Sequence, residues 1–381
     1  MVRTAITAIL ACPSLPRCAL NVGLLLALAA PASAGRGVGT DLASLNLCLY
    51  GDCEARGTYA ADPFGLSNPG TLAFTPHSRF LPRGVVGSGS YFRLHVGDVD
   101  GDLESGVATL AWNTVVFQVA TAYAEADGPV AAEPGVTMHF RTRAVRLAAG
   151  IDAEAFLGIR GLSLGLAGIV PGTKTDVSLA AGGVRFVDST ETRDLELVPG
   201  FLWHTGVHDW LMVGGFLDVV RNGVESRGFD PVTGTPFAKR ATTNVLFARA
   251  GVSTLPLVPF GLADGDSPRD QWLTKVRLAT DVEYRNISAP GEGNVQGATG
   301  FFGLDVPLVP DAWNPLAGWM RVWLLGGVDT RGGWGVGGGL YGDGPLKLFG
   351  CNPAYSSRPL ADFIGDRVKL FAITCSVMVP L

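Results

Sequence analysis

Two histidines and an aspartate, His204, His208 and Asp209, form the most compact group of catalytic residue types in the chain. A histidine beside a serine or a carboxylate can act as a general base, and two histidines at this spacing on one helix can bind a metal ion. The segment instead reads as a strand end followed by a turn, which does not present both side chains on one face. We therefore interpret it as a solvated turn and predict no catalytic residues, no metal site and no cofactor.

An acidic run from Asp98 to Glu104 begins like a calcium-binding loop, with carboxylates at Asp98, Asp100 and Asp102. Closely spaced carboxylates suit a hard cation, but the complete loop needs a glutamate at its twelfth position. Thr109 occupies that position here. We interpret the run as an acidic hairpin turn, and calcium binding near Asp98 stays open.

The N-terminus has the features of a secretory signal peptide. Arg3 and Arg17 precede an apolar segment from Val22 to Ala30, and Ala32-Ser33-Ala34 provides a small-residue cleavage site. We predict that residues 1–34 are removed on export. The positively charged region is longer than usual, so the true start codon stays open.

Cleavage would leave four cysteines in an oxidising compartment, where four thiols allow three pairings. Cys48 and Cys53 are the closest to each other in sequence, and we predict a disulfide between them. The pairing of Cys351 and Cys375 stays open. No histidine lies near enough in sequence to complete a metal site with the first two.

The side chains from Trp272 to Tyr284 alternate with a period of two along the whole run, the pattern of a strand between an apolar and a wet medium. The apolar face consists of Trp272, Thr274, Val276, Leu278, Thr280, Val282 and Tyr284. The opposite face consists of Gln271, Leu273, Lys275, Arg277, Ala279, Asp281, Glu283 and Arg285.

The aromatic ends of the apolar face lie twelve residues apart. At ~3.3 Å per residue and ~45° of tilt this is a height of about 28 Å, close to the spacing of the two aromatic girdles of an outer-membrane barrel. A long sandwich strand with one solvated face is the alternative, but it does not need an aromatic residue at both ends. We therefore predict that Lys275, Arg277, Asp281 and Glu283 line a barrel lumen.

Composition favours one barrel over two soluble domains. The chain of 381 residues is 47% hydrophobic, yet beyond the signal peptide no run of 18 uncharged apolar residues could form a membrane helix. The 52 glycines and 24 prolines suit many strands and turns. A net charge of −5, without a basic stripe, argues against nucleic acid as a partner.

Alternation recurs between turn signals from about Ser88 to the C-terminus. At roughly ten residues per strand plus turns and loops, this length holds about 12 to 16 strands, and an even number near 14 fits best. We predict an all-β fold, a transmembrane antiparallel β-barrel over residues 86–381. Around Trp210 to Arg221 both faces are apolar, so the lumen is expected to be partly apolar.

Residues 35–85 lack this alternation and are predicted to form an N-terminal hatch or plug. Asn68-Pro69-Gly70-Thr71-Leu72-Ala73 resembles the hatch signature of the FadL-like family of long-chain fatty-acid transporters. Members carry an Asn-Pro-Ala-Gly-Leu-like motif before the first barrel strand. Here Gly70 stands in place of the alanine and Thr71 is inserted. Read without the resemblance, the motif is an Asn-Pro turn that leads into a strand.

The resemblance implies a monomeric 14-stranded barrel closed by an N-terminal hatch, with apolar ligands captured on the outside and passed inward. Two unusually apolar connections suit capture, because exposed apolar loops often mark interaction sites. They contain Leu255, Leu257 and Phe260 in one segment and Trp313 in the other. The alternative is that these loops dip into the lipid interface or pack in the barrel mouth.

We therefore expect an integral protein of the bacterial outer membrane, surrounded by lipid, that passes small hydrophobic compounds passively and carries out no chemistry. Substrate identity and transport direction stay open. The first rival is a secretion or assembly component, which protein partners would reveal. The second is an outer-membrane hydrolase, which loss of hydrolysis in a His204 or His208 variant would reveal.

Overall fold

The structure is a computed structural model of the chain. It describes the following residues: 68–73, 83–96, 99–112, 114–129, 136–169, 174–181, 184–205, 210–230, 234–260, 274–289, 293–309, 320–330, 332–342, 350–359 and 367–380. The predicted signal peptide, Cys48, Cys53, His208 and Trp313 lie outside these ranges.

Strands account for nearly all of the regular structure in the described ranges. They are β1 (Arg83–Val96), β2 (Val99–Trp112), β3 (Val115–Pro129), β4 (Val136–Asp152), β5 (Leu162–Ile169), β6 (Lys174–Ala181), β7 (Val184–His204), β8 (Leu211–Phe229), β9 (Pro236–Thr254), β10 (Arg277–Ala289), β11 (Gly293–Val309), β12 (Met320–Asp329), β13 (Trp334–Gly342), β14 (Gly350–Pro359) and β15 (Arg367–Pro380). Three short helices accompany them: η2 (Pro69–Thr71), α5 (Ala153–Leu157) and η3 (Val258–Phe260).

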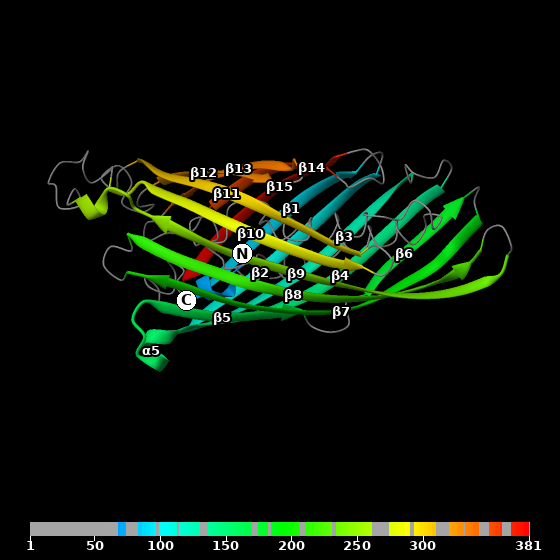
Figure 1. The fold of residues 1–381 in the computed structure, drawn as a ribbon, viewed down its shortest axis with the longest axis horizontal. Coiled ribbons are helices and arrows are strands. Elements are labelled where there is room, and N and C mark those ends of the chain that lie inside the picture. Colours follow the sequence, from blue (N-terminus) through cyan, green and yellow to red (C-terminus); the bar gives the residue numbers. More distant parts are fainter. Residues whose placement is uncertain are drawn as a thin grey trace.

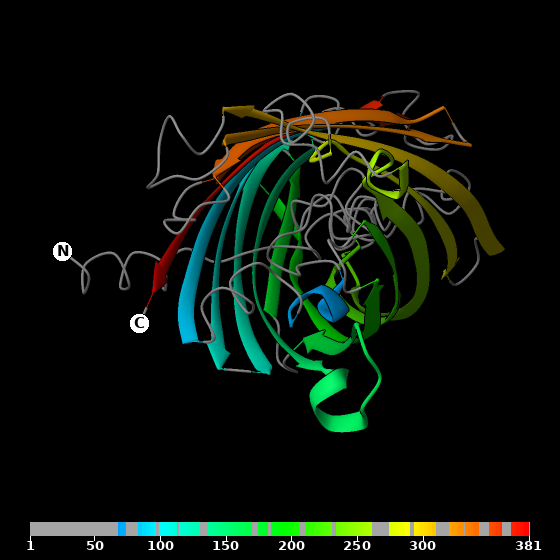
Figure 2. The ribbon, with the colours of Figure 1, turned by 90° about the vertical axis from the view of Figure 1, so that its left-hand side faces the viewer.

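These strands form one antiparallel sheet whose pairings return to their starting point (Figures 1 and 2). β15 pairs with β1, and β3 pairs with both β2 and β4. β5 and β6 occupy one position in succession, because each lies between β4 and β7. The fifteen described strands therefore fill fourteen positions of a ring. The prediction of an all-β antiparallel fold is confirmed.

The division of one position into β5 and β6 leaves part of β7 with fewer partners. The β5–β7 ladder ends where Gly168 pairs with Leu197, and the β6–β7 ladder begins only where Leu179 pairs with Val187. Over the intervening residues β7 still pairs with β8 on its other side. Among the described residues, this part of β7 is therefore held by inter-strand hydrogen bonds on one side only.

Alternation along the strands separates an outer apolar face from an inner buried face. On β7 the outward residues Leu195, Leu197 and Phe201 are exposed, whereas the intervening Glu196 and Val198 are buried. Inner apolar side chains pack into one cluster that includes residues of the described N-terminal segment. Its members are Leu72, Ala73, Val116, Ala148, Ala167, Val198, Phe216, Val220, Val245 and Phe247.

The alternating run that predicts a strand from Trp272 begins later in the structure. β10 starts at Arg277, and Thr274, assigned by pattern to the lipid face, is buried in the turn before it. From Leu278 to Tyr284 the alternation is as expected, with even-numbered residues exposed and odd-numbered residues buried. The period of two therefore located the strand but not its first residue.

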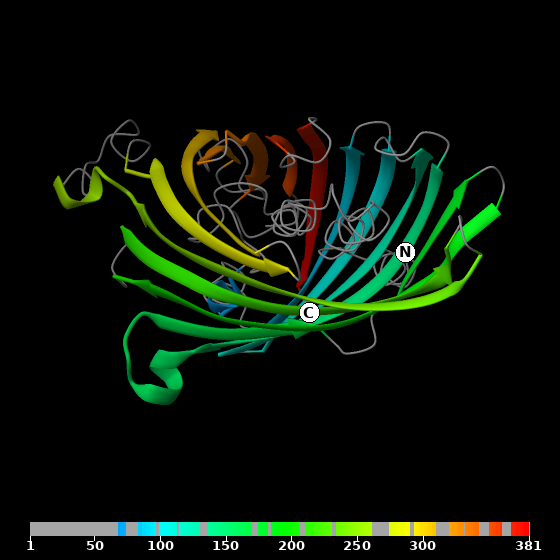
Figure 3. The same cartoon turned by 45° about the vertical axis from the view of Figure 1, so that its right-hand side comes forward.

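The strands are tilted and of unequal length, and β7, β8 and β9 reach well beyond their neighbours (Figures 1 and 3). These three strands have 21, 19 and 19 residues. About 9–11 tilted residues cross a bilayer, so part of each would project from it. Of the helices in the described ranges, none has the length and apolar character needed to span a membrane.

Candidate functional site

Three glycines on the inner face of adjacent strands form a strip without side chains, here called the glycine row. Gly150 on β4 is the direct partner of Gly165 on β5, which in turn is the partner of Gly200 on β7. The segment 68–73 lies against this strip, and Figure 2 shows η2 inside the ring of strands. Glycine within a strand commonly marks a place where another backbone approaches closely.

Any side chain in the glycine row would collide with this segment. A Cβ atom at Gly165 would overlap the carbonyl of Pro69, and one at Gly200 would overlap the Asn68 side chain. A Cβ atom at Gly150 would lie 2.8 Å from the Cβ atom of Leu72. The row is therefore shaped to hold the Asn68-Pro69-Gly70 turn in direct contact with the strand backbones.

Asn68 ties the turn together and also binds it to the wall. Its Oδ1 atom accepts a hydrogen bond from the Gly70 backbone N–H at 2.9 Å, as an N-cap residue does. Its Nδ2 atom donates to the backbone carbonyl of Phe201 at 3.0 Å. The Thr71 hydroxyl donates to the Asn68 carbonyl at 2.8 Å. Because one amide serves as both acceptor and donor, neither aspartate nor alanine can replace it fully.

A buried charge cluster lies on the inner face of β9 and β10. The Arg249 Nη2 atom donates to Asp281 Oδ2 at 3.3 Å, and its Nη1 atom lies 3.9 Å from Glu283 Oε2. The guanidinium carbon lies 4.0 Å from the centre of the Phe301 ring. A Cβ atom at Gly251 would overlap the Asp281 carboxylate, so glycine makes room for it.

A second buried ion pair lies on two of the strands that carry the glycine row, four residues before Gly150 on β4 and four before Gly200 on β7. The Arg146 Nε atom on β4 is 3.7 Å from Glu196 Oε2 on β7, and both side chains are almost completely buried. Buried charges are tolerated when opposite charges compensate them, since an isolated charge in this position is strongly unfavourable. The inner wall is thus charged without being open to solvent at these residues.

The predicted lumen residues lie in two different environments. Arg277, Asp281 and Glu283 are buried on the inner face of β10, with Asp281 and Glu283 only 1% and 2% exposed. The Arg277 Nη1 atom donates to the Ser253 hydroxyl at 3.0 Å. Lys275 is half-buried in the turn before β10. The inward charges therefore pack against one another instead of facing a wide water column.

The predicted capture segment lies at the end of the barrel where β1 begins and β15 ends, because the strands alternate in direction. The Leu255 backbone N–H donates to the Trp210 carbonyl at 2.7 Å, which ties the segment to the start of β8. Leu255 and Leu257 are half-buried, whereas Phe260 in η3 is 77% exposed. The Asn68-Pro69-Gly70 turn lies toward the same end, beside the first residues of β5.

His204, considered above for catalysis, ends β7 with its side chain buried and its backbone N–H bonded to the Gly161 carbonyl at 3.0 Å. Within the described ranges no group of three or more histidine, cysteine and acidic side chains is placed to hold a metal ion. Cys351 and Cys375, whose pairing the sequence leaves open, are direct partners in the β14–β15 backbone register.

Sequence reasoning missed the glycine row and the partners of the lumen charges, including Arg249, Arg146 and Glu196. Gly150, Gly165 and Gly200 each interrupt an apolar strand, and such interruptions are a recognised sign of close backbone approach. Their alignment across three strands requires the register, which no pattern within a single strand supplies.

No family model matches the sequence, and no curated protein matches it. Solved structures match in fold. A FadL homologue of Pseudomonas aeruginosa aligns with a TM-score of 0.50 and 11% identity, over 86% of this chain and 96% of its own. The deltaS2S3 mutant of the monoaromatic hydrocarbon channel TodX aligns with a TM-score of 0.50 and 8% identity, over 85% and 96%. The chain therefore has the β-barrel fold of the FadL-like outer-membrane transporters.

Proposed function

We propose that this protein is an integral outer-membrane channel that passes small hydrophobic compounds passively and has no enzymatic activity. The observation that supports this proposal most directly is the Asn68-Pro69-Gly70 turn, which is buried inside the barrel against the glycine row. A barrel whose interior is filled by its own inward side chains does not need a strip of wall without side chains. It suits a barrel whose interior holds a separate N-terminal segment.

The outer face of the wall supports placement in a membrane. Exposed large apolar side chains occur on strands around the ring, from Phe117 on β3 to Val336 on β13. Soluble monomers rarely expose apolar surface on this scale, whereas the outer face of a membrane barrel requires it. Lipid is therefore the proposed surrounding partner. Because the described strand pairings close on themselves, a single copy needs no second chain to cover a sheet edge, which supports a monomer.

The proposed roles of the segments follow their order along the chain. Residues 1–34 would direct export, and the segment from residue 35 to the start of the barrel would form the hatch. The predicted boundary after residue 85 is three residues too late, because β1 already begins at Arg83. Leu255, Leu257 and Phe260 would collect apolar ligands at the barrel end that also holds the Asn68-Pro69-Gly70 turn. Trp313, which lies outside the described residues, is proposed to take part in this capture. A ligand bound there would lie close to the hatch without crossing the barrel.

Uptake of a labelled hydrophobic compound tests this function. Cells that produce the protein in their outer membrane should accumulate a labelled fatty acid or monoaromatic hydrocarbon faster than cells without it. A labelled sugar of similar mass serves as the control, because its uptake should not change. Equal accumulation of the hydrophobic compound, together with a co-purifying protein partner, would favour the secretion or assembly role.

The segment variant Leu257→Ser/Phe260→Ser tests the capture role within the same assay. It removes apolar contact area worth about 25 cal/mol per Å² while leaving the barrel wall intact. Uptake of the hydrophobic compound should fall without any increase in ion conductance. Unchanged uptake would mean that capture occurs elsewhere.

A further inference from the structure

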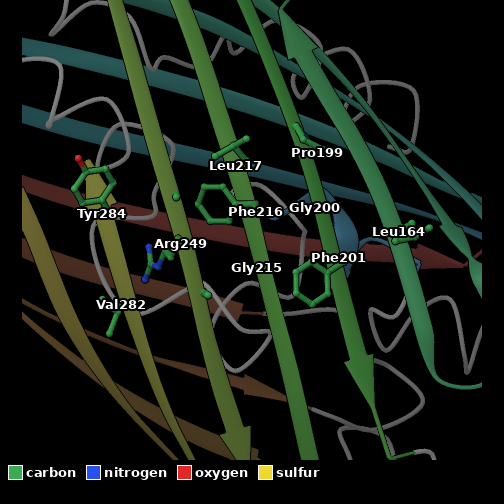
Figure 4. A pocket seen from close by; sticks show the side chains of 12 residues that line it. Leu164, Pro199, Gly200, Phe201, Gly215, Phe216, Leu217, Arg249, Val282 and Tyr284 are labelled. Carbon is green, nitrogen blue, oxygen red and sulfur yellow. The ribbon is translucent and has the colours of Figure 1, made fainter. Parts of the chain in front are cut away.

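The outer face of the wall carries an apolar groove of about 630 Å³. It crosses β5, β7, β8, β9 and β10, and Figure 4 shows the side chains that line it. This volume is within the usual range of ligand-binding sites, about 300–1,000 Å³. The groove lies on the surface that the proposed function assigns to lipid.

Three small residues form the floor of the groove. Gly215 on β8 is the direct partner of Ala250 on β9, and Ala248 lies two residues away on the same strand face. A Cβ atom at Gly215 would lie 2.8 Å from the Arg249 carbonyl oxygen and 3.3 Å from the Phe201 ring. Glycine therefore lets Phe201 lean over the floor and keeps the groove deep.

Larger side chains on both sides form the walls. Phe201 on β7 is the cross-strand partner of Gly215, and Val282 on β10 is the partner of Ala250. Tyr284 is likewise the partner of Ala248. Val282 is 60% exposed and Phe201 and Tyr284 are each 40% exposed, so these walls stand out from the barrel surface. The small residues between them create a depression in an otherwise apolar surface.

The lining offers almost no hydrogen-bonding groups. Arg249 contributes to it, but its buried guanidinium is bonded to Asp281 on the inner side of the wall. The Tyr284 phenol is the remaining polar side-chain group among the lining residues. An occupant therefore gains contact through dispersion and apolar burial, which favours a flexible hydrocarbon over a polar molecule.

The Asn68-Pro69-Gly70 turn lies behind the groove, on the inner side of the same wall. A Cβ atom at Gly70 would overlap the backbone of Phe201, and Asn68 donates to the carbonyl of the same residue. Gly200, also in the lining, has the Asn68 side chain on its inner face. One strand layer thus separates the groove from the turn, so the groove is a pocket on the wall and not a passage through it.

We propose that this groove, bounded by Phe201, Leu217, Val282 and Tyr284 over a floor of Gly215, Ala248 and Ala250, binds one acyl chain of a surrounding membrane lipid. The proposal rests on the membrane placement argued under the proposed function. In a membrane, lipid chains surround that face at high concentration. Small floor residues allow a methylene chain to approach the strand backbone closely, just as small residues let two membrane helices approach each other.

Photo-cross-linking of the full protein in lipid vesicles tests this site. The vesicles contain phosphatidylethanolamine, phosphatidylglycerol and a small fraction of phosphatidylcholine with a diazirine on one acyl chain. After illumination, labelled peptides are mapped by mass spectrometry. Labelling of the segments that contain Leu217 and Val282 should exceed several-fold that of the segment with Leu324 and Val328, which are exposed on β12 outside the groove.

Two variants fill the groove, and one matched variant does not. Ala250→Trp and, as an independent version, Ala248→Phe place a large side chain on the floor and should abolish the excess labelling. Leu324→Trp adds an aromatic side chain to the outer face elsewhere and should leave the excess unchanged. Gel mobility before and after heating identifies the variants that fold.

The possible outcomes distinguish a failure of the acyl-chain site from a failure of the membrane placement. Equal labelling of all outward segments, or an excess that persists in both folded filling variants, would overturn the acyl-chain site while leaving the barrel in the membrane. Displacement of the excess by added toluene would assign the groove to a transported ligand instead. Absence of labelling at every outward segment would overturn the membrane placement and the groove together.

Discussion

The Asn68 Nδ2 atom donates a hydrogen bond to the backbone carbonyl of Phe201 across 133 positions of sequence, at 3.0 Å. This bond joins the N-terminal turn to the barrel wall at the residue that also forms one side of the outer groove. The turn on the inner face and the groove on the outer face therefore contact the same segment of β7. Changes at Asn68 should act on the attachment of the hatch more than on the barrel.

Replacing Asn68→Asp should loosen the hatch by about 1–3 kcal/mol, because the carboxylate keeps the acceptor for Gly70 but loses the donor and faces the Phe201 carbonyl. Ion conductance in planar bilayers should rise, while the temperature at which the barrel loses its folded gel mobility changes little. Asn244→Asp, at an exposed position of β9, is the control. Equal conductance in the two variants would contradict the proposed role of the hydrogen bond from Asn68 to Phe201.

Gly165→Ala should displace the Pro69 turn, since the added methyl group would overlap the Pro69 carbonyl. Gly300→Ala is a matched strand substitution, because nothing lies within 4 Å of a Cβ atom there. Protease digestion of intact vesicles should release N-terminal peptides faster from Gly165→Ala than from Gly300→Ala. If both variants resist digestion as the natural protein does, the turn does not depend on the glycine row.

The buried charge cluster around Arg249 should contribute to the free energy of unfolding. Arg249→Met would leave Asp281 and Glu283 buried without their shared cation, which should cost about 3–5 kcal/mol of unfolding free energy. Adding Asp281→Asn to that variant should recover part of the loss, because one of the two carboxylates is neutralised. Urea unfolding in detergent measures both variants, together with Asp281→Asn alone and the natural protein. Strictly additive effects would show that these charges do not interact.

The outer face was predictable from sequence because lipid contact imposes a simple period of two. Leu278, Val282 and Tyr284 were placed on that face by pattern alone, and all three are exposed. The Asn68-Pro69-Gly70 turn was also predictable, since asparagine and proline have strong local preferences. In each case a few neighbouring residues contain the information.

The inner face was less predictable because its environment depends on residues far apart in sequence. Arg277 and Asp281 suggest a wet lumen when β10 is considered alone. Arg249, Ser253 and Phe301 on neighbouring strands convert it into a packed charged surface. Ala279 on the same face is also buried, so a large side chain there would meet packed neighbours and not water.

Oxidised protein should carry a disulfide between Cys48 and Cys53, which are five positions apart in an exported chain. The backbone register that makes Cys351 the partner of Cys375 favours pairing within each set over pairing between them. Peptide mapping without reduction measures this directly. Free thiols at both N-terminal cysteines, or a link from either to Cys351, would contradict the prediction and indicate a looser hatch.

Deleting residues 35–70 should convert a selective path into a leaky one. The deletion removes Asn68, Pro69 and Gly70, so the glycine row loses its contact. We expect water to enter the barrel interior and reach the side of the wall that carries Asp281 and Glu283. Those charges would then attract ions, and planar bilayers should show a steady conductance that the full protein lacks. The Leu257→Ser/Phe260→Ser variant is the control, because it changes the proposed capture segment but leaves the hatch in place. If the deletion variant folds and stays closed, the segment is not a hatch, and the secretion or assembly role becomes the better explanation of the fold.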